Sequence, residues 1–560
     1  MPDFDPQQIR KQFPLIIDGA TQDGLIYFDN AATTQKPLCV LQAIDDFYRG
    51  SNANVHRAAH RLADRATQTY ENARDTVKRF FNAADRSEII WTRGATEGIN
   101  LVANTLAFAP GDEIVISALE HHANIVPWQL AAQRYKATIK VIPLTTEGDL
   151  DLEAYRALLG PRTRLVAVTQ CSNAIGTQPD LSPMILMAHD AGALVLVDGA
   201  QAVAHHPIDL QQMGCDFFVC SGHKAFGPTG IGILYGKQTL LNQLPPWQGG
   251  GEMISHVSFS GSSYQPAPLR FEAGTPNISG AIGFAAALDM IAGFDRNLLL
   301  QHEQGLLHRA IERCARIPGI KRIGHPASQG PVLSIEIPAL NHKDVAAQLD
   351  LEGIAVRTGH HCAMPLMSLL GTQGTLRASF SIYNTREEID RFADRLESIV
   401  TGSKTPQRRQ AVDSSPFEKG FQRYGQELTF ESLCKPLLAK RDWQQRYRQI
   451  MVFGDQLPLL PESMRTEEAL VSGCESPVWL HVKATESGKL WFMADSDSRL
   501  LRGLLALLLS LANQRSADEL RTFNPMADFY PLGLERHLSP SRSNGLHRIM
   551  EQIRHQAENR

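Results

Sequence analysis

Between residues 20 and 300 the sequence alternates short, continuous apolar segments with stretches of helical periodicity. The clearest apolar segments are residues 114–116, 165–168 and 194–197. Continuous apolar runs of this length are typical of strands that are buried on both faces, as in a mostly parallel sheet. After Gly94, apolar residues recur at Ile99, Val102 and Leu106 with the spacing of a helix. This alternation predicts an α/β fold, with helices covering the sheet.

The chain is expected to hold several domains, because a typical domain has about 150 residues and this chain has 560. Residues 1–300 are predicted to form a large α/β domain with an N-terminal segment, and residues 301–400 a smaller α+β domain. Residues 401–417 are rich in Ser, Thr, Pro, Gln and charge, which predicts a linker. Residues 418–560 again alternate helical and strand patterns and predict a separate domain with its own core.

The bulk composition excludes several classes of function. The net charge is only -4, which does not favour nucleic acid as the main partner. The first residues lack the charged-then-apolar pattern of a signal peptide. The most apolar run, residues 504–511, is far shorter than the ~20 residues of a membrane-spanning helix and predicts a buried helix. We therefore expect a cytoplasmic protein that binds neither membranes nor nucleic acid.

The eight cysteines are scattered along the chain, with no Cys-x-x-Cys pair. This spacing indicates neither a disulfide framework nor a zinc ribbon, and we expect no metal site. Most of the cysteines are expected to be buried as small hydrophobic residues.

Polar residues follow several predicted strands at the point where each strand ends. Asp198 ends one apolar strand, Lys224 follows a second and His121 follows a third, while the segment 94–97 follows a fourth and opens a helix. A lone lysine at the end of a strand usually extends to water. However, the carboxyl ends of strands are also where ligands bind in open α/β sheets.

Together these features match the requirements of pyridoxal phosphate (PLP). A carboxylate such as Asp198 can keep a pyridinium nitrogen protonated, which makes the ring an effective electron sink. Free backbone N–H groups at the start of a helix, together with a hydroxyl group, can hold a phosphate. His121 can stack on a planar ring and move protons. We therefore predict a PLP site at this edge of the sheet.

Three motifs carry a family resemblance. Residues 27–34, 197–201 and 221–224 resemble the cofactor motifs of the cysteine desulfurases, which are fold-type I PLP-dependent transferases, and the similarity covers roughly residues 5–400. The resemblance implies that Lys224 binds PLP covalently, Asp198 pairs with the ring nitrogen, Gln201 contacts the ring hydroxyl and His121 stacks on the ring. It also implies a phosphate site made of Ala95, Thr96, Ser221 and His223, with Thr275 reaching in from the partner subunit of a homodimer. Asn173 and Arg377 match positions that bind the substrate carboxylate and the cofactor face.

A second informative segment, residues 357–365, contains Cys362. Burial as a hydrophobic residue is the commoner fate of a lone cysteine. A metal site made of His360, His361 and Cys362 is not favoured, because adjacent residues point in different directions. A loop thiol near histidine and arginine would instead favour the thiolate. The segment resembles the active-site loop of the SufS-type (group II) desulfurases, which implies that Cys362 is the nucleophile and carries sulfur from L-cysteine as a persulfide.

The C-terminal region contains Cys474, which follows a glycine and precedes a strand-like segment. Taken alone, this segment favours a packed cysteine at the start of a strand. Residues 473–476, 494–498 and 537–546 nevertheless resemble the SufE sulfur-acceptor family. The resemblance implies an α+β SufE-like domain in which Cys474 receives sulfur from Cys362. Cys434 has no such motif and is expected to lie in the core.

The sequence therefore predicts a homodimeric cysteine desulfurase that converts L-cysteine to L-alanine and passes the sulfur from Cys362 to Cys474. The resemblance to the SufS and SufE pair implies that the sulfur goes to iron–sulfur cluster assembly, through a scaffold protein. Two alternatives remain open at this point: a selenocysteine lyase on the same scaffold, and a non-catalytic sulfur-relay protein.

Overall fold

The computed structural model of the chain describes residues 5–18, 24–56, 59–402, 416–440, 443–472, 476–485, 487–533 and 540–558. The chain divides into two units, Met1–Pro338 with Ala346–Gly402, and Ala339–Val345 with Ser403–Arg560. The predicted linker, residues 401–417, lies largely outside the described residues, and the predicted domain boundaries stay predictions.

The first unit is built on a seven-stranded sheet in the order β2-β8-β7-β6-β5-β3-β4. Its strands are β2 (Ile89–Thr92), β3 (Glu113–Ser117), β4 (Thr138–Ile142), β5 (Thr163–Thr169), β6 (Leu194–Asp198), β7 (Phe217–Ser221) and β8 (Gly232–Gly236). The neighbouring strands β7, β6, β5, β3 and β4 pair in parallel, whereas β8 is antiparallel to both β7 and β2. The predicted mostly parallel sheet is confirmed, and the three apolar segments lie in β3, β5 and β6.

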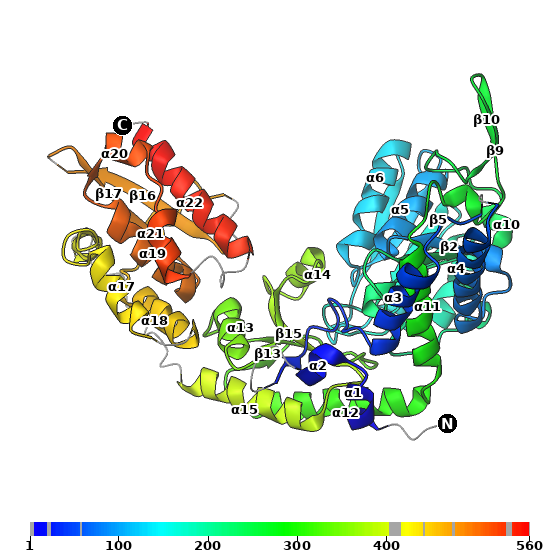
Figure 1. Cartoon of the computed structure of the whole chain (residues 1–560), viewed down its shortest axis with the longest axis horizontal. Coiled ribbons are helices and arrows are strands. Elements are labelled where there is room, and N and C mark those ends of the chain that lie inside the picture. Colours follow the sequence, from blue (N-terminus) through cyan, green and yellow to red (C-terminus); the bar gives the residue numbers. More distant parts are fainter. Residues whose placement is uncertain are drawn as a thin grey trace. The chain divides into compact units, whose positions relative to one another are not determined.

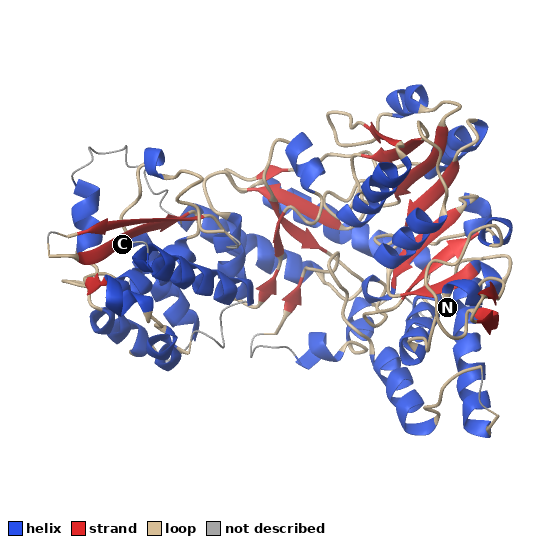
Figure 2. Ribbon diagram, turned by 90° about the horizontal axis from the view of Figure 1, so that it is seen from above, coloured by secondary structure: helices blue, strands red, loops and turns tan. Residues whose placement is uncertain are grey.

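Helices cover both faces of this sheet (Figures 1 and 2). One group consists of α5 (Ala95–Thr105) and α6 (Val126–Tyr135), and the other of α3 (Leu38–Gly50), α4 (Arg61–Phe80), α8 (Leu181–Asp190) and α11 (Ile278–Ala292). Because side chains alternate along a strand, Ile90 and Leu196 pack in the core under the first group, and Ile89 and Val195 in the core under the second. Burial on both sides explains why the strands read as continuous apolar segments.

A smaller sheet in the order β11-β12-β15-β14 completes the first unit, and its strands pair antiparallel. The strands are β11 (Lys321–Arg322), β12 (Val332–Glu336), β14 (Arg357–Gly359) and β15 (Thr375–Ser379). Its helices are α12 (Arg296–Ala315), α14 (Met364–Leu369) and α15 (Arg386–Gly402). Helix α13 (His342–Asp350) begins in the segment that is assigned to the second unit and ends in the first. The N-terminal strand β1 (Ile26–Tyr27) pairs in parallel with β13 (Ile354–Ala355). The N-terminal segment therefore joins the large sheet region to the smaller one.

Shorter elements fill the remainder of the first unit. They are α1 (Pro6–Arg10), α2 (Pro14–Asp18), α7 (Leu152–Leu158), α9 (Leu210–Met213), α10 (Gln238–Leu241), the hairpin of β9 (Ile254–Ser258) and β10 (Gly261–Tyr264), and the 3-10 turns η1 (Arg86–Glu88), η2 (His122–Asn124), η3 (Gly222–Lys224) and η4 (Leu269–Phe271).

The second unit combines an antiparallel sheet with helices. The sheet runs β16 (Val478–Ala484), β17 (Lys489–Ser496) and β18 (Arg515–Ser516). The helices are α16 (Pro416–Gln422), α17 (Phe430–Leu438), α18 (Trp443–Gln456), α19 (Arg499–Ala512), α20 (Ala517–Arg521), α21 (Met526–Phe529) and α22 (Pro540–Glu558), with the turns η5 (Glu462–Met464) and η6 (Tyr530–Leu532). Helix α19 contains the predicted buried helical run and is buried along most of its length, so that prediction is confirmed.

Helices α18 and α19 approach each other more closely than side chains normally allow. A Cβ atom at Gly454 would lie 2.0 Å from the Arg499 carbonyl oxygen, and one at Gly503 would lie 1.9 Å from the Ile450 carbonyl oxygen. Only glycine fits at both positions, so this contact fixes the packing of the second unit.

Among the described residues, no single helix is both long and apolar enough to cross a membrane, although the bent pair Ile278–Ala292 and Arg296–Ala315 passes that test together by length and composition.

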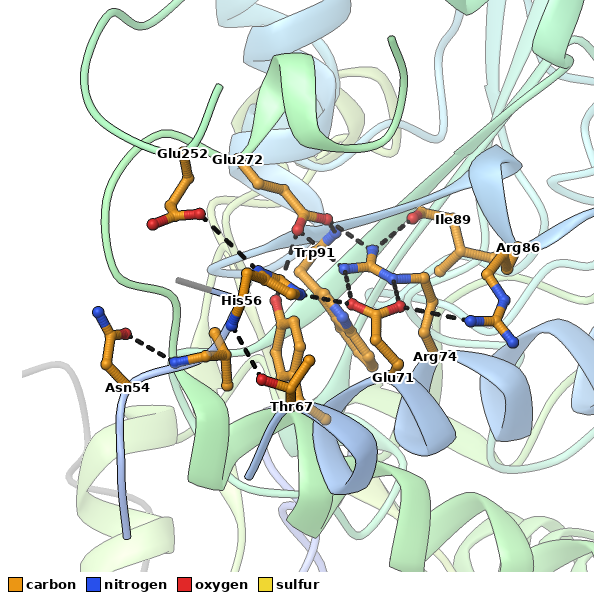
Figure 3. Close-up of polar contacts among 12 residues, drawn as sticks. Asn54, His56, Thr67, Glu71, Arg74, Arg86, Ile89, Trp91, Glu252 and Glu272 are labelled. Atoms are coloured by element: carbon orange, nitrogen blue, oxygen red, sulfur yellow. Dashed lines mark hydrogen bonds and ion pairs between the residues drawn. The ribbon is translucent and has the colours of Figure 1, made fainter. Parts of the chain in front are cut away.

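A buried arginine joins three segments of the first unit (Figure 3). Arg74 of α4 has a fully buried side chain and donates to both carboxylate oxygens of Glu272, at 2.7 and 2.9 Å. The same carboxylate accepts the backbone N–H of Trp91, in β2, at 2.8 Å. The rings of Tyr70 and Trp91 lie 5.4 and 5.6 Å from the guanidinium carbon, within the range of cation–π attraction. The network therefore fixes strand β2, and the segment that begins at Glu272, to helix α4.

The outer edge of this network is more exposed and contains a histidine. Glu71 accepts from Arg74 Nε at 3.2 Å and lies 3.1 Å from His56 Nε2 (Figure 3). Hydrogen bonds from His56 and Arg74, partly offset by burial, lower the pKa of Glu71 to about 2. Glu71 therefore stays ionised and supplies a second negative charge to the guanidinium.

We expect Glu272→Leu to destabilise the protein by about 3–5 kcal/mol, because it removes the buried carboxylate that pairs with Arg74 and leaves only the more exposed Glu71 beside that charge. The double variant Arg74→Met with Glu272→Leu should lose clearly less, since it removes both charges. Urea denaturation of the full chain measures both values. Glu153→Ala, which removes a carboxylate from an exposed ion pair on α7, should change the free energy of unfolding by less than about 0.5 kcal/mol. Equal losses in the single and double variants would contradict the assignment.

Candidate active site

The carboxyl ends of β6 and β7 place Asp198 and Lys224 beside each other, as expected for neighbouring parallel strands. Burial lowers the pKa of Lys224 below its ordinary value, and the nearby Asp198 carboxylate opposes that shift. Burial raises the pKa of Asp198 in turn, while the N–H of Ala200 and the charge of Lys224 act against it. Both groups therefore lie where their protonation is set by the protein interior and by each other.

The start of helix α5 lies against the end of β7. Helix α5 has Gly94 at its N-cap and no side chain that caps it. The N–H of Ala95 donates to the Ser221 hydroxyl at 2.9 Å. A Cβ atom at Gly232, the first residue of β8, would lie 2.6 Å from the Gly94 Cα atom. The start of α5 and the start of β8 therefore touch through backbone alone. The structure thus brings Ala95, Thr96 and Ser221 to one place, where the Thr96 N–H, unlike that of Ala95, has no hydrogen-bond partner among the described residues and is open toward a ligand.

The turn that carries Lys224 is anchored by the N-terminal motif. The carbonyl of His223 accepts hydrogen bonds from the Thr34 N–H at 3.0 Å and from Lys36 Nζ at 3.0 Å. Burial lowers the pKa of Lys36 to about 8. Burial, followed by the charges of Lys224 and Lys36, lowers the pKa of His223 to about 4. Lys36 is a site residue that the sequence interpretation missed, although it lies two residues after the recognised 27–34 motif.

His121 and Gln201 each make a hydrogen bond with the backbone. Burial, followed by the charge of Lys224, lowers the pKa of His121 to about 4, so its ring is neutral at pH 7. Its Nδ1 accepts from the Ala123 N–H at 3.0 Å, which leaves the proton on Nε2. Gln201 is buried and donates to the Ala31 carbonyl at 2.7 Å.

Arg377 links the smaller sheet to the large one. Its Nη1 donates to the Asn173 carbonyl at 2.8 Å and its Nη2 to Asp29 at 3.0 Å. Its buried Nε has no hydrogen-bond partner among the described residues. The site thus holds Arg377 and Asn173 side by side, and one guanidinium N–H remains available to a ligand.

Cys362 lies in the loop between β14 and α14, with a partly exposed thiol. The charges of Cys362 and Arg377 both influence the pKa of Lys224, which places the thiol within electrostatic reach of the amine. The side-chain amide of Asn173 donates to the His361 carbonyl at 2.6 Å, and His361 Nε2 lies 2.8 Å from the Thr375 hydroxyl. The loop is therefore fixed against the same residues that surround Lys224.

The remaining cysteines differ from Cys362. Cys171, Cys215, Cys220, Cys314 and Cys434 are buried, as expected for most of them, and Cys39 is exposed. Burial raises the pKa of Cys434 to about 11, which agrees with the prediction that this residue lies in the core. Among the described residues no group of three or more His, Cys, Asp or Glu side chains could hold a metal ion.

Two predicted site residues are not brought to this cluster. Thr275 is exposed in the segment that follows Glu272, so its predicted place in the site of a partner subunit stays a prediction. Cys474, with Gly473 and Glu475, lies outside the described residues. Of the SufE-like motifs, residues 494–498 run from the end of β17 to the N-cap of α19, and residues 540–546 lie in α22.

The sequence interpretation also missed Glu120, a buried carboxyl next to His121. It accepts from the Ser117 hydroxyl, from the Thr169 N–H at 2.9 Å and from the Asn124 side chain at 2.7 Å. Burial raises its pKa to about 8, although the three donors act in the opposite direction. Glu120 therefore ties the turn that carries His121 to strand β5.

The comparisons with known proteins agree with this site. Residues 26–392 match the "Aminotransferase class-V" family, and residues 431–557 match SufE, the "Fe-S metabolism associated domain". A probable cysteine desulfurase 1 of Mycobacterium leprae is 48% identical over 402 residues, and a cysteine desulfurase of Escherichia coli O127:H6 is 48% identical over 400 residues. The alignments cover 71% of this chain, but 66% of the M. leprae protein and 98% of the E. coli protein.

Solved structures give the same result. The crystal structure of the cysteine desulfurase CsdA from Escherichia coli has a TM-score of 0.67 and 43% sequence identity, and it covers 71% of this chain and 99% of its own. The fold and the strand-end lysine site define a class-V aminotransferase. The chain belongs to this family, among the cysteine desulfurases, and it continues into a SufE domain.

Because the pKa of Glu120 is raised, the free energy of unfolding should depend on pH. The folded protein binds this proton more tightly than the unfolded chain, so the contribution of Glu120 is complete below pH 4.5 and is lost as the pH rises through about 8. We expect the free energy of unfolding to fall between about pH 6 and about pH 9, and Glu120→Gln, which cannot ionise, to reduce that fall. Urea denaturation at the two pH values measures it, with exposed Glu397→Gln as a control that should match the native protein. An unchanged fall in Glu120→Gln would show that Glu120 does not titrate in this range.

Proposed function

We propose that this protein is a PLP-dependent cysteine desulfurase that converts L-cysteine to L-alanine, holds the sulfur as a persulfide on Cys362 and passes it to Cys474. The observation that carries the proposal is the meeting of Lys224, Asp198 and Cys362 at one edge of the sheet, where the charges of the last two influence the pKa of the lysine. The identity to cysteine desulfurases over the first 400 residues or so supports the same conclusion.

The residues present fit PLP. Only the Ala200 N–H donates to the Asp198 carboxylate among the described residues, at Oδ1, so Oδ2 is left for the ring nitrogen. The open N-terminus of α5 and the Ser221 hydroxyl suit the phosphate, and no described residue accepts a hydrogen bond from the Lys224 amine. When bound, PLP supplies an electron-withdrawing ring that makes the α-proton of an amino acid removable.

The chain's own residues supply the acid–base chemistry. The lowered pKa of Lys224 increases the neutral fraction of its amine, which can then bind a carbonyl group or accept the α-proton. Neutral His121 can pass a proton at Nε2 and stack on a planar ring. Asp198 is placed to balance positive charge on the ring nitrogen. Arg377, through its free Nε, and Asn173 are the proposed ligands of the substrate carboxylate.

Cys362 performs the sulfur transfer. Its thiolate attacks the sulfur of the substrate cysteine, so that an S–S bond forms while the C–S bond breaks. The carbon keeps the bonding electron pair and takes up a proton, which yields alanine and a persulfide on Cys362. The reaction needs no external oxidant, since the substrate carbon, which keeps the bonding electron pair, is reduced as the substrate sulfur is oxidised to the outer persulfide sulfur.

Several partners belong to the same proposal. We propose a homodimer through the desulfurase domain, with Thr275 of each subunit completing the phosphate site of the other. The cytoplasm is the proposed location, because the described cysteines are free and persulfide chemistry needs reduced thiols.

The SufE match supports Cys474 as sulfur acceptor, and an iron–sulfur scaffold protein as the next recipient. Selenocysteine lyase activity stays a prediction, which the rate of alanine release from L-selenocysteine would test.

The first experiment incubates the PLP-loaded protein with L-cysteine without reductant and searches its peptides for one added sulfur by non-reducing mass spectrometry. We expect sulfur on the peptides of Cys362 and Cys474, and on neither in Cys362→Ser, because Cys362 receives it first. The exposed Cys39 is an internal control and should carry none. Sulfur on Cys362 alone would exclude the acceptor role of Cys474, and sulfur on neither would exclude the reaction.

The covalent connection between the units should matter for turnover. The predicted linker, residues 401–417, separates the two family matches, and a tether of this length can raise the effective concentration of an acceptor to the mM range. We expect cleavage at a protease site inserted in this segment to slow alanine release by about 10-fold at low protein concentration. The control is the Cys474→Ser variant with the same protease site. Cleavage of this variant should not slow its alanine release further, because it has no acceptor thiol to separate. Unchanged turnover after cleavage would contradict a role for the fusion.

A further inference from the structure

His122 joins the Cys362 loop to the segment that follows strand β3. Its backbone N–H donates to the carbonyl of Cys362 at 2.7 Å, and its ring Nε2 accepts from the N–H of Met364 at 3.0 Å. One residue of the large sheet region therefore holds the chain at Cys362 and again two residues later. No part of the proposed reaction uses this histidine.

The backbone of the loop is of a kind that needs support. His361 and Cys362 have φ values of +52° and +54°, in the left-handed region that residues with a side chain rarely occupy. Asn173 holds the His361 carbonyl, and the N–H of Cys362 donates to His360 Nδ1 at 3.0 Å. These contacts fix the loop up to Cys362, whereas His122 fixes it beyond that residue.

We propose that His122 is a positioning residue for the nucleophile: its neutral imidazole holds Met364 and thereby keeps Cys362 toward Lys224. The proposal rests on the proposed function only in giving Cys362 its role. Accepting from Met364 requires a lone pair on Nε2, with the proton on Nδ1. An imidazolium has no such lone pair, so protonation of His122 removes the contact.

The surroundings of the ring set the pH at which this happens. The rings of His121 and His360 face it, with centroids 6.2 and 5.6 Å away. Burial, followed by the charge of His360, lowers the pKa of His122 below its ordinary value of 6.5. Because the pKa in the closed loop lies below that of the detached side chain, the contact is complete above pH 6.5 and weakens as the pH falls below it.

The test measures hydrogen–deuterium exchange in the full-length, PLP-loaded protein, in a peptide that covers residues 360–366. His122→Ala should raise the exchange rate of this peptide about 2- to 10-fold, because the chain loses one net hydrogen bond. In His122→Gln the amide oxygen can still accept from Met364, so the rate should stay within about 2-fold of the native rate. His308→Ala, at an exposed histidine of α12, is the matched control and should leave the rate unchanged. Native exchange in His122→Ala would overturn the proposal.

The pH dependence separates this role from a merely structural one. From about pH 7.5 to about pH 5.5, after correction for intrinsic exchange, the native loop should lose more protection than the His122→Gln loop, because the Cys362 N–H also donates to an imidazole, that of His360, in both proteins. Equal loss in both proteins, or loss in neither, would overturn the proposal. Alanine release is measured in parallel: if the native protein releases none, the proposed function fails, while the exchange data still decide whether His122 holds the loop.

Discussion

The desolvation of Lys224 beside Asp198 is the interaction on which the site depends. An ammonium group removed from water loses hydration free energy, so burial shifts the equilibrium toward the neutral amine. The Asp198 carboxylate opposes that shift of the Lys224 pKa and is itself held by the Ala200 N–H. The parallel register of β6 and β7 creates this pair, because it ends both strands at the same edge of the sheet. The fold thus determines the chemistry of the amine.

Cys362, the proposed nucleophile, comes from the other sheet region of the first unit, so its place depends on contacts between two parts of the fold. Arg377 of β15 donates to Asp29 and to the Asn173 carbonyl, and Asn173 in turn donates to the loop of Cys362. His122 makes the remaining contacts. Arg377 and Asn173 each satisfy a buried polar group of the other sheet region, and with His122 they support the left-handed backbone of the loop.

Sequence periodicity identified the strands and the polar residues at their ends, because both are local properties of the chain. Asp198, Lys224 and His121 were predictable for this reason. The Arg74–Glu272 pair, the Lys36 contact with His223 and the His122 contact with Met364 were not. Arg74 and Glu272 are 198 residues apart, and no spacing rule connects them. Cys474 was found from a family resemblance, since its own segment favoured a packed cysteine.

Burial also determines which thiol can carry sulfur. Burial raises the pKa of Cys171, Cys215 and Cys314 to about 12, so these thiols stay protonated and out of reach of a small thiol substrate. Cys362 is partly exposed and lies within electrostatic reach of Lys224, at the place where the substrate sulfur must arrive. The path of the sulfur therefore depends less on the number of cysteines than on which thiols stay exposed, because most of the described thiols are desolvated. For the same reason, an acceptor thiol must be exposed where it meets Cys362. A separate domain on a tether can supply such a thiol without opening the core of the first unit.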